Sequence, residues 1–314
     1  MITAGVMNML KPPGMTSFGL TSFVRRCFHG VKAGHTGTLD PAATGVLPVC
    51  LGRATGLASF WTACEKTYRA EMTLGVTTDT QDATGKPLTV RPVAAGNDIA
   101  AIRQVLSSMS GSLMQIPPMY SAVRSGGKHL YELARQGREI PRKARPVKIH
   151  AINLISVSGR RVLFDVRCSS GTYVRTLCAD IGEKLGCGAC MSGLIRLACG
   201  PFRLEEAVTV ERLENLSRDG REEEAVLSVN ALLDAVPVLK LNNEDREGFL
   251  SGAPVAVSLQ EAEGIGATGS VAGTQTLYRI CDREGCLLGT TTDLRGKTEE
   301  DREVIIIGKR HRLV

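Results

Sequence analysis

A glycine-rich stretch, residues 34–45, leads directly into an apolar run and constrains the fold more than any other part of the chain. It reads Gly-His-Thr-Gly-Thr-Leu-Asp-Pro-Ala-Ala-Thr-Gly and contains one carboxylate, Asp40. Pro41 biases Asp40 toward extended or turn geometry, and glycine permits sharp bends and close approach of the backbone. The apolar residues 46–51 predict a buried strand. We therefore expect Asp40 on a rigid loop that enters the core, either as a plain turn residue or as a presented functional group.

Length and composition predict an ordinary globular protein. The 314 residues exceed one typical compact core, so we expect two domains. The start of the chain lacks the pattern of a signal peptide, and no apolar run reaches membrane-spanning length, so we expect a cytoplasmic protein. The ten cysteines should then be mostly reduced. Cys187 and Cys190 form a Cys-x-x-Cys without a matching second pair, so we expect no metal site.

Positive charge is concentrated in one segment. The chain has a net charge of +6, and residues 124–148 alone contain eight Lys or Arg and two Glu. This segment therefore carries as much net charge as the whole chain. It can be a solvated surface, or it can clamp phosphate groups by neutralising their charge. Tyr120 and Tyr131 could stack on bases there, or could anchor the segment to the core.

Side-chain periodicity predicts the elements around the glycine-rich loop. A helix should run from a cap at Thr16 or Ser17 to about Phe28. Residues 66–74 alternate like a half-buried strand, with Tyr68 on the inward face. An inward tyrosine is most often a core residue with its hydroxyl bonded.

A second helix should follow Thr172, which is a plausible N-cap. Arg175 then lies in the first turn, where its head group could simply extend into water. A permanently charged guanidinium is also suited to holding a carboxylate. Residues 79–85 contain two aspartates, but their spacing does not fit a calcium loop, so we interpret them as a turn between strands.

Beyond residue 237 the chain consists of short apolar pieces separated by Gly, Asp and Asn. Residues 249–255, 277–280 and 304–308 are examples. This pattern predicts a small β-rich barrel.

The string at 34–45 resembles the catalytic-loop motif GHTGxLDPxATG of pseudouridine synthases, and in particular that of the bacterial tRNA pseudouridine synthase B (TruB) family. A twelve-residue string with fixed Gly, His, Asp and Pro is far more specific than a short glycine-rich pattern. The resemblance runs from residue 8 to about residue 200, thins after 205 and is only positional beyond 237. Further matching motifs are Lys11-Pro12, Lys66-x-Tyr68-Arg69, Gly171-Thr-Tyr-Val-Arg175 and Leu194-Ile-Arg-Leu197.

The resemblance implies an isomerase that converts uridine to pseudouridine at position 55, in the T loop of tRNA, without a cofactor. The target base must be flipped into a pocket. The implied site is catalytic Asp40, kept ionised by Arg175 through a lowered pKa, with Lys11 in support and with His35, Tyr68, Tyr173 and Leu194 binding the substrate. Whether Asp40 attacks C1′, removes a C2′ proton or attacks C6 of the uracil stays open.

The resemblance also implies the architecture. Residues 1–236 should form the α+β pseudouridine synthase fold, a mixed and mainly antiparallel sheet with flanking helices, and 237–314 a PUA-like RNA-binding β-barrel. The segment at about 117–148 should close on the T arm. Its expected contacts to the RNA backbone are Arg124, Lys128, Arg142, Lys143 and Arg145. We expect tRNA as partner, no membrane, no obligate protein partner and a monomer.

Three other interpretations are open. One is a non-catalytic tRNA-binding or tRNA-folding chaperone on the same fold, although intact Asp40, Tyr68 and Arg175 argue against it. Another is a guide-RNA-dependent relative that modifies ribosomal RNA with partner proteins, against which the compact length and the basic segment weigh. The third is an aspartate hydrolase, for which the sequence offers no metal site or base partner.

Overall fold

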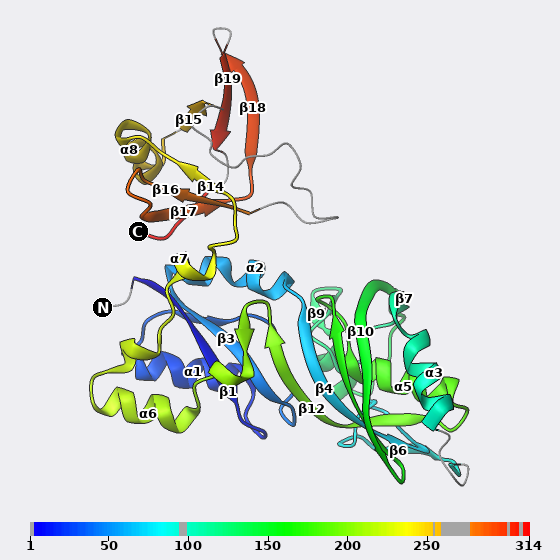
Figure 1. Ribbon diagram of the computed structural model, residues 1–314. Helices are drawn as coiled ribbons and strands as arrows, with labels where there is room; N and C mark the ends of the chain where they lie inside the picture. The colour runs from blue at the N-terminus through cyan, green and yellow to red at the C-terminus, as the bar shows by residue number, and fades with distance from the viewer. Residues whose placement is uncertain (1–2, 94–98, 254, 259–276, 300–301, 308–309) are drawn as a thin grey trace.

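The structure is a computed structural model and describes residues 3–93, 99–253, 255–258, 277–299, 302–307 and 310–314. A larger body, residues 3–236, lies below a smaller C-terminal part, residues 237–314, in Figure 1. Within the described ranges, no helix combines the length and the apolar character that a membrane crossing requires.

Thirteen strands are described in the larger body, and most of them belong to one sheet (Figure 1). They are β1 (Ala4–Lys11), β2 (Ala33–His35), β3 (Thr44–Gly52), β4 (Lys66–Leu74), β5 (Val76–Thr78), β6 (Pro87–Val90), β7 (Gly111–Gln115), β8 (Arg124–Ser125), β9 (Lys128–His129), β10 (Arg145–Ser158), β11 (Arg161–Cys168), β12 (Ala189–Cys199) and β13 (Phe202–Arg203).

The helices of the larger body flank that sheet. They are α1 (Ser17–Cys27), the 3-10 helix η1 (Arg53–Leu57), α2 (Ala58–Ala63), α3 (Ile99–Ser108), α4 (Leu130–Arg135), α5 (Val174–Lys184), η2 (Leu204–Glu206), α6 (Val210–Arg218), η3 (Glu222–Ala225) and α7 (Val229–Leu232).

The main sheet has the order β1-β3-β12-β4-β11-β10-β7, and β2 and β13 pair at its side. Neighbours are antiparallel except β12 and β3, which pair in parallel. The expected mixed, mainly antiparallel sheet with flanking helices is therefore confirmed. The parallel pair places the end of β12 beside the start of β3, which is where the glycine-rich loop returns to the sheet.

Both faces of the sheet are packed. On β1, Met7 and Met9 pack with α1 and α6 on one face, whereas Val6 packs with Trp61 on the other. At the far end, α3 and α5 cover strands β4, β10 and β11 and form the largest core cluster. This alternation follows from the period of two along a strand, which sends successive side chains to opposite faces.

Local sequence signals explain most element boundaries. α1 begins at Ser17, and the side chain of its N-cap Thr16 accepts a hydrogen bond from the Gly19 amide. β4 is buried at every second residue, with Tyr68 inward as predicted. The predicted cap at Thr172 is wrong, because α5 begins at Val174. The Thr172 hydroxyl instead donates to the Ser169 carbonyl at 3.0 Å and closes the turn that follows β11.

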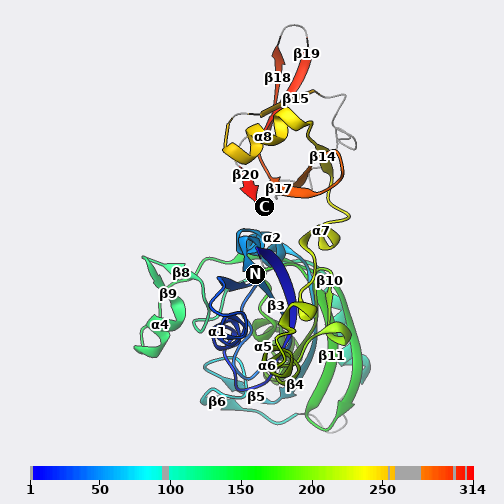
Figure 2. The same ribbon diagram turned by 90° about the vertical axis from the view of Figure 1, so that its left-hand side faces the viewer.

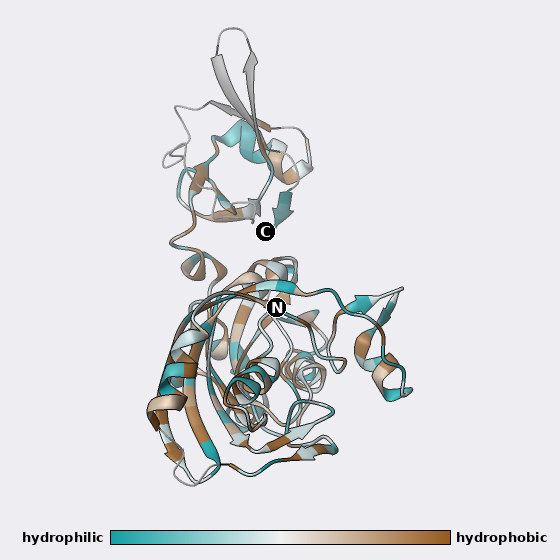
Figure 3. Cartoon of the chain, turned by 90° about the vertical axis from the view of Figure 1, so that its right-hand side faces the viewer, coloured by the Kyte–Doolittle hydropathy of each residue, from teal (hydrophilic) through white to brown (hydrophobic). Residues whose placement is uncertain are grey.

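Within the basic segment, residues 117–148, the elements β8, β9 and α4 stand off the main sheet in Figures 2 and 3. The segment has a small apolar core of its own, in which Met119, Leu130 and Leu133 are buried. β8 and β9 form a short hairpin ahead of α4, and the helix ends close to Gly137 as predicted. Tyr131 stacks on the His129 ring at 5.2 Å and lies under the Arg135 guanidinium at 5.5 Å.

The C-terminal part contains two small sheets, ordered β14-β16-β17-β20 and β15-β19-β18. The described strands do not close into a barrel, so the predicted barrel is not confirmed. Phe249, predicted in an extended piece, lies in a helix capped by the Asn242 side chain. The elements are β14 (Val238–Lys240), α8 (Asn243–Ser251), β15 (Val255–Ser258), β16 (Tyr278–Cys281), β17 (Leu287–Thr291), β18 (Leu294–Glu299), β19 (Arg302–Ile307) and β20 (Arg310–Arg312).

Gly45 is the point where the loop and the sheet meet most closely. Its φ is +113°, and a Cβ there would lie 2.6 Å from the Arg196 amide nitrogen and closer still to the Arg196 carbonyl oxygen. Gly111 has a similar φ, +101°, but open space around the same position. Comparing alanine variants at Gly45 and Gly111 therefore separates the energetic cost of the positive φ from the cost of the close backbone contact.

We predict that Gly111→Ala lowers the free energy of unfolding by about 1–3 kcal/mol, and that Gly45→Ala lowers it by at least about 2 kcal/mol more, because backbone must also move. Urea unfolding of the two variants measures the difference. Equal losses would show that β12 does not constrain residue 45.

Candidate active site

A forked ion pair lies at the centre of the site. The Arg175 guanidinium, in the first turn of α5, meets both carboxylate oxygens of Asp40, with Nε 3.0 Å from Oδ2 and Nη2 3.3 Å from Oδ1. The Arg175 side chain is only 7% exposed, whereas 37% of the Asp40 side chain is exposed. Arg175 therefore does not extend into water, and Asp40 is left facing outward on a fixed partner.

Arg175 also joins two other segments to the loop. Its Nη2 donates to the Tyr120 carbonyl at 2.8 Å, and its Nη1 donates to the Thr80 carbonyl at 3.3 Å. A second carboxylate, Asp82, lies 3.8 Å from Nη1. The basic segment and the turn at residues 79–85 thus meet Asp40 through one side chain.

The turn at 79–85 is built by its own aspartates, as the sequence indicated. Asp82 Oδ1 accepts hydrogen bonds from the amide and hydroxyl of Thr84, and Asp79 Oδ1 accepts one from the Lys86 amide. The described residues contain no group of three or more His, Cys, Asp and Glu that could hold a metal ion.

The pKa of Asp40 is raised above its ordinary value. Loss of hydration is the largest cause; Arg175 opposes it, Asp82 adds to it and Lys11 opposes it. The expectation that Arg175 lowers this pKa is confirmed, but desolvation, which the sequence did not indicate, outweighs the effect of Arg175. The ion pair limits the rise, but the carboxyl group is surrounded by too much protein for one partner to reverse it.

Lys11 is a buried clamp and not a solvated turn residue. Its ammonium group donates to the carbonyls of Pro12 at 2.9 Å, Met15 at 2.7 Å and Pro41 at 3.1 Å. Burial lowers the pKa of Lys11 to about 8. The contact to Pro41 fixes the peptide directly after Asp40.

Ser17 holds the other side of Asp40. Its hydroxyl accepts from the Leu39 amide at 2.9 Å and donates to the Leu39 carbonyl at 3.0 Å. Both Ser17 and Leu39 are buried. The residues before and after Asp40 are therefore each tied to the start of the chain.

Arg196 supports the loop from behind, and it is not among the site residues expected from the sequence. Its side chain is fully buried on β12, where Nε donates to the Val46 carbonyl at 2.6 Å and Nη2 to the Gly37 carbonyl at 3.2 Å. No carboxylate pairs with it among the described residues. A signal existed, because Arg196 is two residues after Leu194 and so lies on the same strand face.

Tyr68 and Leu194 form an apolar wall beside the loop. In the strand register Tyr68 is opposite Arg196, and Leu194 is opposite Ala70. Both pack in the core cluster that contains Leu39 and Ala43, which flank Asp40 in sequence. Burial raises the pKa of Tyr68 to about 12, although the Arg196 side chain opposes the rise. The phenol therefore stays neutral.

Tyr173 is half-buried at the N-terminus of α5, and its backbone is held by an unpredicted partner. The Gln115 amide accepts from the Tyr173 N–H at 3.0 Å and donates to its carbonyl at 3.4 Å. His35 lies on β2 opposite Val49, and its Nδ1 is buried without a hydrogen-bond partner in the described part of the chain. Burial lowers the pKa of His35, and Arg196 adds to the effect.

The five basic residues expected on RNA differ in their surroundings. Arg142 is engaged by its own segment, with Nη1 donating to the Pro117 carbonyl and Nη2 to Glu139. The other four are exposed; Arg124 also donates to His129 Nε2 at 3.4 Å. They are Arg124, Lys128, Lys143 and Arg145.

Comparison with known proteins identifies the family. Residues 25–174 match the family model described as the N-terminal domain of TruB family pseudouridylate synthase, and residues 175–236 match the C-terminal domain of tRNA pseudouridylate synthase B. Similar proteins named tRNA pseudouridine synthase B are 52% identical in Alkaliphilus oremlandii (68% of this chain, 70% of that protein) and 42% identical in Methylobacillus flagellatus (91% and 89%).

Solved structures agree with the fold. A Cbf5-Nop10-Gar1 complex contains a chain that is 28% identical, with a TM-score of 0.71 over 98% of this chain and 84% of that one. A second match comes from an H/ACA RNP bound to a substrate RNA containing 2'-deoxyuridine, with a TM-score of 0.68 and 25% identity over 98% of this chain and 84% of that one.

The sheet and the carboxylate-centred site thus define a pseudouridine synthase fold. Within that class, the chain belongs to the TruB family of pseudouridylate synthases.

We predict that Arg196→Met lowers the free energy of unfolding by about 3 kcal/mol, because it leaves two buried carbonyls without donors. Arg69→Met is the matched control, since Arg69 pairs with Asp165 through a similar fork at the surface. Its effect should be much smaller because exposed pairs contribute little. Equal shifts of the urea midpoint would contradict a supporting role of Arg196.

Proposed function

We propose that this chain isomerises uridine to pseudouridine in tRNA, at position 55 of the T loop, with Asp40 as the catalytic residue. The observation that carries the proposal is the fork between outward-facing Asp40 and buried Arg175, beside the wall of Tyr68 and Leu194. The names of its relatives, tRNA pseudouridine synthase B, support the substrate.

The site suits a reaction that needs one carboxylate. The bond from C1′ to N1 breaks, a bond from C1′ to C5 forms, the C5 proton is released, and N1 takes up a proton, so that product and substrate are isomers. Attack at C1′, removal of a C2′ proton and attack at C6 all begin from ionised Asp40. Arg175 orients that carboxylate and stabilises its charge, while Lys11 and Ser17 hold the peptides on either side.

Binding the flipped base falls to the residues around the fork. Tyr68 and Leu194 offer a flat and an apolar wall, and Tyr173 is placed two residues before Arg175 by Gln115. His35, whose lowered pKa keeps it neutral, would contact the RNA. The reaction as proposed uses no cofactor.

The wider organisation follows the same proposal. Residues 1–236 act as the catalytic domain and 237–314 as a PUA-like RNA-binding domain, in a cytoplasmic monomer without an obligate protein partner. The basic segment at 117–148 clamps the T arm. Arg124, Lys128, Lys143 and Arg145 contact phosphates, and Arg142 contributes mainly by bracing the segment.

Two alternatives remain distinguishable by experiment. The solved neighbours come from a Cbf5-Nop10-Gar1 complex and from H/ACA particles, so a guide-RNA-dependent reaction on ribosomal RNA with partner proteins is the first alternative. A chaperone on the same fold would bind tRNA without turnover.

We predict that Asp40→Asn abolishes turnover and keeps the fold, because an amide cannot act as nucleophile or base. Tritium release from C5-labelled uridine in an unmodified tRNA transcript measures turnover, and circular dichroism measures folding. Asp79→Asn, in the neighbouring turn, should stay active. A tRNA with cytidine at position 55 should release no tritium.

The outcomes separate the alternatives. Release by wild type without added protein or guide RNA excludes the guided reaction. Tight tRNA binding without release by wild type would favour the chaperone. Near-normal turnover by Asp40→Asn would overturn the role of Asp40.

The pH profile should report the raised pKa of Asp40. Because the carboxylate must be ionised, kcat/KM should fall as the pH falls through that pKa, at a pH above the ordinary range for aspartate. Asp82→Asn removes a nearby negative charge that raises this pKa, so the acid limb should move to lower pH.

Asp79→Asn serves as the control, since Asp79 does not contribute to the shift of Asp40. Its profile should superimpose on that of wild type. An acid limb that stays in place in Asp82→Asn would show that another group controls it.

A further inference from the structure

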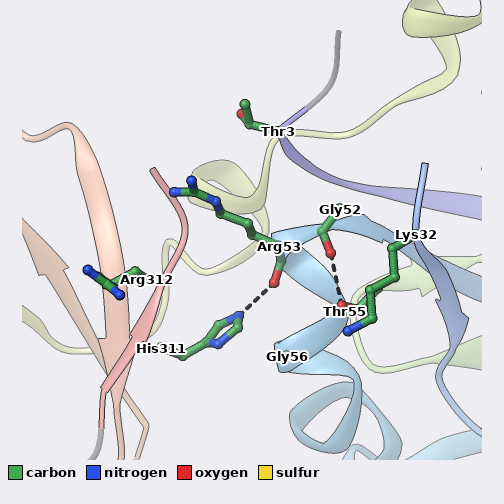
Figure 4. A pocket seen from close by; sticks show the side chains of 8 residues that line it. All are labelled: Thr3, Lys32, Gly52, Arg53, Thr55, Gly56, His311 and Arg312. Atoms are coloured by element: carbon green, nitrogen blue, oxygen red, sulfur yellow. Dashed lines mark hydrogen bonds between the residues drawn. The ribbon is translucent and has the colours of Figure 1, made fainter. Parts of the chain in front are cut away.

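A group of positively charged side chains, separate from the basic segment, lies between the larger body and the C-terminal part. A cavity of about 440 Å³ opens there, lined by Thr3, Lys32, Gly52, Arg53, Thr55, Gly56, His311 and Arg312. Figure 4 shows these residues, which come from four places in the sequence, where the two parts of the chain meet. Three of them carry permanent positive charge at neutral pH, and none of the described lining residues is acidic.

The two parts of the chain meet at this cavity through a specific, packed contact. The imidazole of His311 is 2.6 Å from the Arg53 carbonyl oxygen through Nε2. A Cβ on Gly56 would overlap that imidazole ring, so the contact requires glycine there. Leu277 and Leu313 from the C-terminal part pack in one cluster with Trp61 of the larger body. The seam is therefore packed as well as bonded.

The charges in the cavity are available to a ligand. Lys32 and Arg53 are exposed, and neither forms an ion pair within the described part of the chain. Arg312 donates to the Leu250 carbonyl, and in Figure 4 its guanidinium points away from Lys32 and Arg53, so these two side chains carry the charge that faces a ligand. Uncompensated positive side chains at the edge of a cavity attract anions.

The position of the cavity indicates which anion. It lies at the end of the nine-residue strand β3, whose other end receives the Asp40 loop, so the two sites are roughly 25 Å apart at strand spacing. A double-stranded RNA arm carries phosphates along its whole length, and RNA-binding modules commonly contact it at separated points.

We propose that this seam cavity binds phosphodiester groups of tRNA outside the T loop. The inference rests on the proposed function, because it takes tRNA as the substrate. Lys32 and Arg53 supply the charge, and the His311 contact fixes the C-terminal part beside them. The site holds the body of the tRNA while the uridine enters the pocket of Asp40.

The test compares full-length tRNA with a hairpin of the T stem and loop. The double variant Lys32→Gln/Arg53→Gln should bind full-length tRNA about fivefold or more weakly, and the slope of log Kd against log salt should become shallower by about 1 for each phosphate that is no longer neutralised. Hairpin binding and hairpin turnover should match wild type. Arg160→Gln/Arg161→Gln removes the same charge from an exposed hairpin elsewhere and should not change the ratio of the two Kd values.

A second variant tests the seam without removing charge. Gly56→Leu should displace His311 and weaken full-length tRNA binding while hairpin turnover persists. Titration of wild type with inorganic phosphate tests whether the cavity binds only small anions. Such a site would bind phosphate tightly, and both variants would then bind full-length tRNA as well as wild type does. That result, or equal weakening on tRNA and hairpin, would overturn the proposal. Absence of turnover by wild type on either RNA would count against the proposed function instead, since the binding comparison does not need turnover.

Discussion

The fork from Arg175 to Asp40 is the interaction on which the rest of the site depends. One buried guanidinium holds the loop aspartate, the turn through Thr80 and the start of the basic segment through Tyr120. Three segments that are distant in sequence are thereby fixed to the first turn of α5. Because all donors of one planar group are used together, a shift of any segment changes the orientation of the carboxylate.

The loop lies between two arginines with opposite consequences. Arg175, in front, meets carboxylates and limits the rise in the pKa of Asp40. Arg196, behind, meets only backbone carbonyls and a phenol, so its charge is not compensated locally. Burial is the main cause of the lowered pKa values of His35 and Lys11, and the charge of Arg196 adds to it. Asp40 is therefore surrounded by its ion-pair partner and by groups whose pKa values are shifted toward the neutral form.

The sequence predicted the parts of this site that depend on residues close together in the chain. The glycine-rich string, the alternation around Tyr68 and the helix with Arg175 are each readable within a few residues. Arg196 and Gln115 were missed because their partners, Gly37 and Tyr173, are far away in the chain and meet them only in the folded sheet. The net direction of the Asp40 pKa was missed for the same reason, since desolvation depends on the whole surroundings. In the C-terminal part the pattern predicted strands correctly for the described residues, but the barrel that it also predicted is not confirmed, and it missed the helix containing Phe249.

The basic segment has its own small apolar core, which affects the entropy cost of binding RNA in the proposed clamp. Met119, Leu130 and Leu133 are already packed, and Tyr131 is already stacked between His129 and Arg135. Ordering a disordered segment on binding costs about 1–2 kcal/mol for each residue fixed. A segment that is folded beforehand avoids most of that cost and needs to immobilise only its connections to the sheet. In the proposed clamp on the T arm, the positive charges of the segment can therefore contribute nearly in full to the affinity for RNA.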